Sequence, residues 1–375
     1  MRDVLSMNRQ SGMAGVHSLD RIKALREKTF EKNKFDTFLI FSENNLLYFT
    51  GVPGMSCLLV PHEGRSTVFV YGVNYELAKA EAKGFDVEMV KRGEELTTKI
   101  LPHLKALKSK RVAADALSIE SYTSLAEHMK GKTEVATAGD LVWELRKVKD
   151  EKEITLMKKA ADITSAGMKV AYETIRPGRT EIEVAAEIEY AMRGKGSWGT
   201  AFETLVSSGT SSAFPHGGCS EKKIRSGDLV VVDIGASYHN YCSDMTRTMV
   251  AGKPSEKQKK LYDVVKKAHK EALEAMKPGA KARDVDLAAR RVVEGAGYGE
   301  FFVHGLGHGI GLEVHEPPSL SPKSKDLLAA GNVVSDEPGI YLVNYGGVRI
   351  EDSVLVTGSA PEKLTIVSYT LETQK

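Results

Sequence analysis

The sequence is poor in cysteine and has no hydrophobic run long enough to span a bilayer. Its 375 residues include three cysteines, Cys57, Cys219 and Cys242. Three cysteines cannot form a disulfide framework, so we expect free thiols in a reducing compartment. The first residues carry no apolar segment of the signal-peptide kind. The sequence therefore predicts a cytoplasmic protein with no membrane partner.

An excess of either charge is also missing. Lys and Arg number 52 and Asp and Glu number 50, which gives a net charge of +2. This balance, with no basic stripe of interleaved aromatics, argues against a nucleic-acid partner. The chain also has no HExxH motif, which excludes the zincin metallopeptidases.

The length and the alternation of elements predict two domains. We expect a flexible N-terminus over 1–16, a small α/β domain over 17–135, a linker over 136–150 and a second domain over 151–375. In the first domain, strands at 36–41, 56–60, 66–72 and 85–90 alternate with helices at 18–35, 74–83, 94–107 and 119–129. Ser18 is the expected N-cap of the first helix.

The second domain repeats a pattern at an offset of 101 residues. Pro177-Gly178 recurs as Pro278-Gly279, Gly194 as Gly295 and Gly196 as Gly297. A long helical run precedes each copy, and Thr180 with Glu183 has capping-box spacing. We interpret this as one domain built from two related halves, each made of two helices and a hairpin, although chance similarity remains an alternative.

Each half contains a hairpin pattern with two acidic residues. A turn centred between Tyr238 and His239 would place Asp233 opposite Asp244, and like charges in opposite positions need a neutralising group such as a cation. A turn displaced by one or two residues would instead leave two solvated aspartates. In the second half, a turn centred on Asn344 would place Glu337 opposite Glu351.

Between the hairpins lies HGLGHGIGLEVHEPP, with glycines at every second position from 305 to 311. On a strand, His308 would share one face with Leu306 and Ile310, while the bare glycine face would let another backbone approach. A lone core histidine is the alternative. Beside four carboxylates, His308 fits a metal site, and such oxygen-rich ligands suit Mn²⁺, Co²⁺ or Fe²⁺ at least as well as Zn²⁺. Four negative charges would balance two divalent ions.

Five ordered motifs carry a family resemblance: FPHGG, VVVDIGASYHNYCSDMTRT, GLGHGIGLEVHE, DEPGIY and GVRIED. Together they resemble the M24 metallopeptidases, and within these most closely the prolidases. The resemblance implies an α/β (α+β) fold. It comprises a pita-bread catalytic domain with two pseudo-symmetric halves, preceded by a smaller creatinase-like α/β domain.

The same resemblance implies a role for eight residues. Two divalent ions, most often Mn or Co with Zn or Fe as alternatives, would be held by Asp233, Asp244, His308, Glu337 and Glu351. Glu337 would carry the proton, and His216 and His315 would hold the substrate and stabilise the oxyanion. Arg349 would bind the substrate's terminal carboxylate.

Simpler roles remain open for two of these residues, and one neighbouring residue departs from the family pattern. Arg349 could pair with Asp352 or another acid, and His315 could orient the turn that follows it. Asp336 departs from the family pattern, in which an apolar residue often precedes the glutamate. It would point away from the metals if the strand alternates, or add charge to the site if the strand bulges.

The implied activity is hydrolysis of Xaa-Pro dipeptides by a bridging hydroxide on a dinuclear metal centre. One alternative is an Xaa-Pro aminopeptidase acting on longer peptides. Another is a non-catalytic, peptide- or protein-binding homologue. A homodimer is implied by the resemblance alone.

Overall fold

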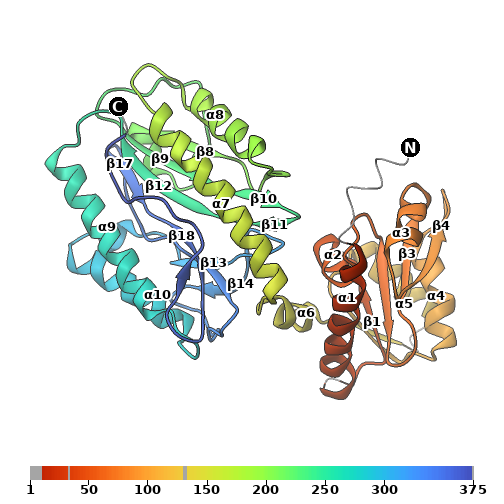
Figure 1. Cartoon of the computed structure of the whole chain (residues 1–375). Coiled ribbons are helices and arrows are strands. Elements are labelled where there is room, and N and C mark those ends of the chain that lie inside the picture. Colours follow the sequence, from red (N-terminus) through yellow and green to blue (C-terminus); the bar gives the residue numbers. More distant parts are fainter. Residues whose placement is uncertain (1–10, 33, 130–132, 374–375) are drawn as a thin grey trace. The chain divides into compact units, whose positions relative to one another are not determined.

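The computed structural model describes residues 11–32, 34–129 and 133–373 (Figure 1). The chain divides into two compact units, of which the first ends at Arg146 and the second begins at Lys147. No described helix is both long enough and apolar enough to cross a membrane.

The first unit is a six-stranded mixed sheet with helices packed on it. Its strands are β1 (Thr37–Ile40), β2 (Cys57–Pro61), β3 (Thr67–Tyr71), β4 (Asp86–Val90), β5 (Arg111–Ala114) and β6 (Glu134–Thr137). They lie in the order β4-β3-β2-β1-β5-β6. The helices are α1 (Ser11–Arg26), α2 (Glu43–Thr50), α3 (Tyr75–Glu81), α4 (Leu96–Ala106), α5 (Ile119–Met129) and α6 (Gly139–Arg146), with a π-helical turn at Glu27–Lys32. The short apolar runs form the strands because both faces of this sheet are largely buried.

Two features of this unit differ from the sequence expectation. The first helix begins at Ser11, so Ser18 lies inside it and the predicted N-cap is wrong. The residues just before Ser18 include no proline that would prevent them from being helical. A serine, although common at N-caps, does not by itself start a helix. Of the segment predicted as flexible, residues 1–10 lie outside the described residues. The predicted linker, 136–150, contains the end of β6 and all of α6.

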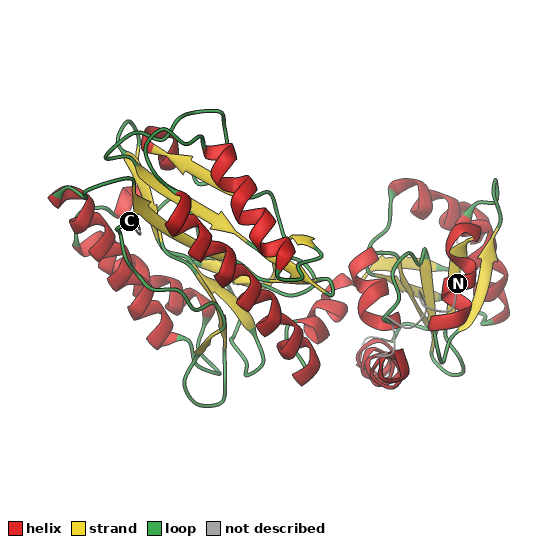
Figure 2. Ribbon diagram, turned by 45° about the horizontal axis from the view of Figure 1, so that its top comes forward, coloured by secondary structure: helices red, strands yellow, loops and turns green. Residues whose placement is uncertain are grey.

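The second unit contains long helices and several small antiparallel sheets (Figures 1 and 2). Its helices are α7 (Glu151–Thr174), α8 (Glu181–Gly194), α9 (Glu256–Ala275) and α10 (Ala282–Gly295). The strands of its first half are β7 (Gly199–Thr200), β8 (Leu205–Ser208), β9 (Leu229–Ile234), β10 (Ala236–Tyr238), β11 (Tyr241–Cys242) and β12 (Met245–Val250). Those of the second are β13 (Gly307–Gly309), β14 (Glu316–Leu320), β15 (Val333–Asp336), β16 (Gly339–Leu342), β17 (Gly346–Arg349), β18 (Asp352–Leu355) and β19 (Glu362–Lys363).

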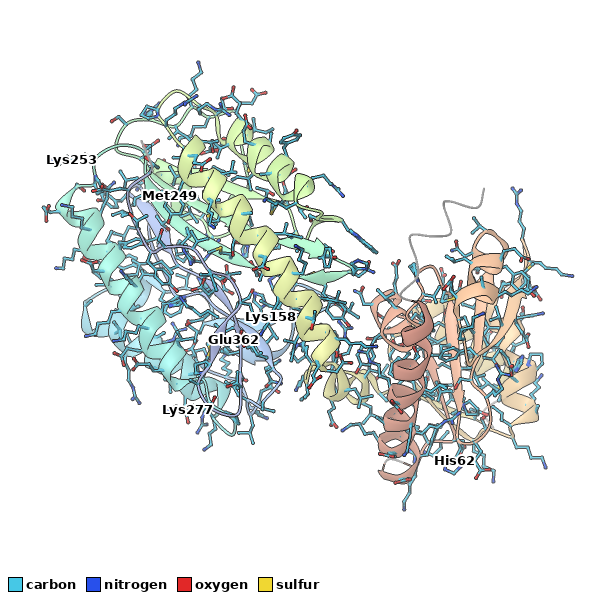
Figure 3. All side chains as sticks on the ribbon, in the orientation of Figure 1. His62, Lys158, Met249, Lys253, Lys277 and Glu362 are labelled. Atoms are coloured by element: carbon cyan, nitrogen blue, oxygen red, sulfur yellow. The ribbon has the colours of Figure 1, made fainter. Side chains whose placement is uncertain are left out.

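The two halves of this unit repeat the order helix, helix, hairpin, as the sequence predicts. Helices α8 and α10 begin and end at the offset of 101 residues. Thr180 and Glu183 form the predicted capping box of α8. One apolar core lies between α7, α8 and the β8–β9–β12 sheet, and a second lies between α9, α10 and the strands of the second half. Lys158 of α7 pairs with Glu362 of β19 at 2.7 Å, linking the first helix of the unit to its last strand (Figure 3).

The first hairpin differs from its predicted register. Asp233 of β9 pairs with Thr246 of β12, so Asp233 and Asp244 are not directly opposite. The turn is formed by His239 and Asn240, which have φ values of 47° and 68°, one residue later than predicted. A tight hairpin turn needs positive φ at both central residues, and Asn and His tolerate it better than Tyr238 does.

The second hairpin has its predicted register. Gly339 pairs with Arg349 and Leu342 with Gly346, around a turn in which Asn344 has a φ of 66°. The ladder between β15 and β18 continues in the same register, ending with Asp336 opposite Asp352. Glu337 and Glu351 lie between these two ladders, at positions that the shared register places opposite each other.

Candidate metal centre

One cavity of the second unit gathers every residue for which the sequence predicts a functional role. It has a volume of about 480 Å³. The eight predicted residues all line it: Asp233, Asp244, His308, Glu337, Glu351, His216, His315 and Arg349.

Three potential metal ligands of different types, an aspartate, a histidine and a glutamate, lie close together in the cavity. Asp244, His308 and Glu351 each offer one atom that lies within 4.8 Å of the other two. Asp244 and Glu351 are 4% and 1% exposed. Buried carboxylates around an imidazole form a donor set that a divalent cation fits.

Asp233 and Glu337 lie beside this group. Glu337 Oε1 is 3.3 Å from His308 Nε2, and Asp244 Oδ2 is 3.7 Å from the same nitrogen. Asp233 Oδ1 is buried and accepts no hydrogen bond from the described residues. A bound cation would give this buried oxygen the partner that the described residues do not provide. The residues present therefore fit a divalent metal.

His308 is held with one ring nitrogen directed at the carboxylates. Its Nδ1 lies 3.1 Å from the carbonyl oxygen of Gly309, which leaves Nε2 for a metal. The glycines on either side of His308 allow strand β13 to pack closely against neighbouring backbone. A Cβ on Gly307 would collide with the carbonyl of Ser335, and one on Gly309 with the carbonyl of Pro317. The glycine spacing thus serves close backbone approach, as the sequence predicts.

The electrostatics of the site favour a bound cation. Burial and the neighbouring Asp233 raise the pKa of Asp244 well above its ordinary value, and burial and Asp244 do the same for Glu351. Burial acts to lower the pKa of His308, but Glu337 and Asp244 outweigh it and raise the pKa to about 9. Without a metal, protons must therefore neutralise part of the cluster's charge.

The guanidinium of Arg349 is hydrogen-bonded to three side chains of the protein. Its Nη2 donates to Asp233 Oδ2 at 2.6 Å, its Nη1 to the hydroxyl of Tyr341 at 2.9 Å, and its Nε to Thr246 Oγ1 at 3.0 Å. The residue is 3% exposed. It therefore pairs with an acid in this structure, but with Asp233 and not with Asp352.

The two other histidines predicted from the sequence, His315 and His216, are exposed and lie at the rim. His315 precedes β14, and its ring centroid is 4.2 Å from that of His308. Burial and His308 lower its pKa, so its ring is neutral at neutral pH. His216 follows the short helix Gly209–Ala213 and is exposed. Both can donate to a carbonyl oxygen placed over the cluster.

Three further residues, Tyr341, His304 and Thr246, form hydrogen bonds at the site and are not predicted from the sequence. The Tyr341 hydroxyl lies 2.9 Å from His304 Nε2 as well as from Arg349. Thr246 Oγ1 donates to Glu351 Oε2 at 2.7 Å. Thr246 stands two residues after Asp244, and this strand alternation was a signal that could have found it. The hydrogen bond between Tyr341 and His304 has no local sequence signal.

Asp336 points away from the cavity. It is the last residue of β15, is fully buried, and lies near His269 of α9. Of the two alternatives for this residue, the structure shows the alternating strand. Asp336 does not line the cavity and adds no carboxylate to it.

Comparison with known families agrees with this geometry. A family model described as metallopeptidase family M24 matches residues 155–358, and one described as the creatinase/prolidase N-terminal domain matches residues 21–148. This chain belongs to metallopeptidase family M24. The fold class predicted from the sequence, a creatinase-like domain followed by an M24 pita-bread domain, is confirmed.

Several M24 relatives match nearly the whole chain. A protein of Pyrococcus horikoshii named Xaa-Pro dipeptidase is 40% identical over 92% of this chain and 97% of its own length. The structure of an Xaa-Pro dipeptidase from Bacillus anthracis is 35% identical, covers 95% of this chain and 99% of its own, and has a TM-score of 0.89. That of an X-Pro aminopeptidase from Thermotoga maritima is 36% identical, with coverage of 90% and 97% and a TM-score of 0.82.

Proposed function

We propose that this M24 protein hydrolyses Xaa-Pro dipeptides with two divalent metal ions, Mn²⁺ or Co²⁺, held by Asp233, Asp244, His308, Glu337 and Glu351. The observation that carries the proposal is the convergence of these five residues on one cavity. The dipeptidase names of relatives that cover nearly the whole chain support the substrate class.

The donor set defines what the chain contributes to hydrolysis. Bound divalent ions supply an acidified water and polarise the scissile carbonyl. In this proposal Glu337 moves a proton toward the proline nitrogen, because its carboxylate lines the cavity and lies 3.3 Å from His308 Nε2. His315 and His216 are placed to donate to the carbonyl oxygen as it gains charge.

The cavity also offers apolar contacts for a proline ring. Alongside the polar cluster it is lined by Phe202, Leu205, Pro215 and Val314. A peptide bond to proline has no N–H to bind, so recognition has to rely on such contacts and on the polar groups around them.

One observation favours the aminopeptidase as a second candidate. Arg349 is the only arginine or lysine among the described residues that line the cavity, and its donors are engaged by Asp233, Tyr341 and Thr246. A substrate carboxylate directly after proline would therefore compete with Asp233 for this guanidinium. A longer peptide places its carboxylate elsewhere.

Kinetic assays separate these candidates. We expect the Mn²⁺- or Co²⁺-loaded protein to cleave Ala-Pro and Leu-Pro, and to leave Ala-Ala intact. Faster cleavage of Ala-Pro-Ala than of Ala-Pro would identify an aminopeptidase. No cleavage of either, with metal bound, would refute the proposal and leave the binding homologue.

A pair of variants ties the activity to the site. Glu337→Gln preserves the shape of the side chain but removes the carboxylate, and we expect kcat to fall by about 100-fold or more. The matched control is Glu362→Gln, which alters a glutamate whose side chain is 46% exposed and should leave kcat unchanged. The homodimer and the cytoplasmic location remain predictions from the sequence.

A further inference from the structure

Two aspartates lie directly opposite each other behind the metal-binding glutamates. Asp336, the last residue of β15, pairs with Asp352, the first residue of β18. Both are fully buried, and neither lines the cavity. Like charges in directly opposite positions destabilise a sheet, and burial raises the pKa of Asp336, so the pair requires a compensating group when Asp336 is ionised.

The compensating group for Asp336 comes from helix α9, which packs on β15. His269 Nε2 lies 3.6 Å from Asp336 Oδ2 and 3.2 Å from Asp352 Oδ2. Burial acts to lower the pKa of His269, but the two aspartates outweigh it and raise the pKa above its ordinary value.

The two aspartates differ in their other partners. Asp352 accepts hydrogen bonds from Arg247 Nη2 at 2.8 Å, from Thr365 and from Tyr369. Both oxygens of Asp336 accept none from the described residues. Within the described part of the chain, His269 is the basic side chain that forms an ion pair with Asp336. The backbone ladder holds β15 to β18 here, and His269 adds an ion-pair contact to the side chain of Asp336.

Each aspartate is covalently next to a metal ligand. Asp336 precedes Glu337, and Asp352 follows Glu351. Successive side chains of a strand point to opposite faces, so the glutamates reach the cavity while the aspartates reach α9. Adjacent Cα atoms are about 3.8 Å apart, and a shift of either aspartate therefore moves the neighbouring glutamate. Arg247 also donates to the backbone carbonyl of Glu351 at 2.7 Å, which fixes that strand independently.

We propose that His269 is a positioning residue of the metal centre, which holds Asp336 against Asp352 and so sets the separation of Glu337 and Glu351. The inference rests on the proposed function, because it assumes that the two glutamates bind metal. It assigns α9, a helix with no residue in the metal cluster, a part in metal affinity. Groups outside the ligand set that orient ligands typically contribute 10–100-fold to affinity.

The test uses His269→Gln, which retains a polar side chain and removes the positive charge. We expect the Mn²⁺ dissociation constant, measured by calorimetry, to rise about 10–100-fold. The visible spectrum of the Co²⁺-loaded protein should change, because the glutamates no longer meet the ion at the same separation. At saturating Mn²⁺, kcat on Ala-Pro should fall while KM stays within about twofold.

A second substitution completes a double-mutant cycle. In the wild-type background, Asp336→Asn removes the ion pair to His269 and should weaken Mn²⁺ binding about threefold or more. In the His269→Gln background, the same substitution should change Mn²⁺ binding by less than about twofold, because the ion pair that it removes is already lost. This dependence of one substitution on the other is not expected if His269 only stabilises the fold.

Lys270→Gln is the matched control, since it alters the next residue of α9, whose side chain is 71% exposed. It should behave as wild type. An unchanged Mn²⁺ affinity and Co²⁺ spectrum in His269→Gln would overturn the proposal, even if the melting temperature falls. If His269→Gln does not fold, wild-type Mn²⁺ affinity in Asp336→Asn alone would overturn it. A wild-type protein that binds no Mn²⁺ and cleaves no Xaa-Pro peptide would instead refute the proposed function.

Discussion

Arg349 donates to Asp233 Oδ2 over 2.6 Å, while the other oxygen of Asp233 is buried and accepts no hydrogen bond from the part of the chain that the structure describes. The guanidinium thus restrains the rotation of this carboxylate through Oδ2 and leaves Oδ1 available to a ligand. The Arg349 guanidinium can therefore affect metal binding, substrate binding or both. Substituting Arg349 distinguishes these effects.

Arg349→Lys retains the positive charge but cannot connect Asp233, Tyr341 and Thr246 through one planar group. We expect the Mn²⁺ affinity and kcat/KM on Ala-Pro to fall together by about 10–100-fold. The control is Arg283→Lys at an exposed position. A rise in KM with unchanged Mn²⁺ affinity would show that the guanidinium binds the substrate carboxylate instead, as the family resemblance implies.

Gly307→Ala should destabilise the second unit, because the new Cβ collides with the backbone of Ser335. We expect a loss of about 1–3 kcal/mol in the free energy of unfolding, measured by chemical denaturation. Gly194→Ala is the comparison, since nothing lies within 4 Å of its Cβ at the end of α8. A fully stable Gly307→Ala protein would contradict the close approach of β13 to β15.

Removal of metal should abolish peptidase activity and lower the melting temperature. At a Mn²⁺ concentration 100 times its dissociation constant, binding stabilises the folded state by about 2.7 kcal/mol. For a unit of this size that corresponds to a shift of roughly 5–10 °C. Chelation followed by calorimetry tests this, and Mn²⁺ or Co²⁺ should restore both properties. An unchanged melting temperature on Mn²⁺ addition would count against the site.

The stabilisation of the folded protein by bound metal should increase with pH. The pKa of His308 is about 9 in the metal-free fold against an ordinary 6.5, so the folded state holds this proton more tightly than the unfolded chain. Its contribution to stability is complete below pH 6.5 and is lost as the pH rises through 9. The raised pKa values of Asp244 and Glu351 also make the metal-free fold less stable as the pH rises.

Metal ions compete with these protons, so their affinity rises over the same interval. We expect the difference in melting temperature between Mn²⁺-loaded and metal-free protein to widen from pH 6.5 to pH 9. Calorimetric scans at several pH values measure it. A difference that narrows over this interval would contradict protonation of the metal-free cluster.

The sequence predicts much of the fold because its signals are local. The capping box of Thr180 and Glu183, the matched ends of α8 and α10, and the turn at Asn344 each depend on a few neighbouring residues. The first hairpin was misplaced by one residue because both Tyr238-His239 and His239-Asn240 can be read as its turn. The backbone shows that only the second pair takes positive φ.

The motifs predict that the five proposed metal ligands converge, but they do not predict the contacts that support these residues. The bond from Arg349 to Asp233 joins β17 to β9, and the contact of His269 with Asp336 joins α9 to β15. Each connects segments that lie more than 60 residues apart in the sequence. Spacing and periodicity describe single elements, so such pairs become visible only when the elements are packed.

The pairing of β15 with β18 has a consequence for insertions and deletions. Along these strands, acidic side chains occupy both faces at consecutive positions, Asp336-Glu337 and Glu351-Asp352. Sliding one strand by a single residue would exchange the faces, so that an aspartate entered the cavity and a glutamate entered the helix-covered core. The composition of the chain would hardly change, yet the metal would meet a shorter side chain. Catalytic competence in this molecule is thus a matter of strand alignment as much as of residue identity.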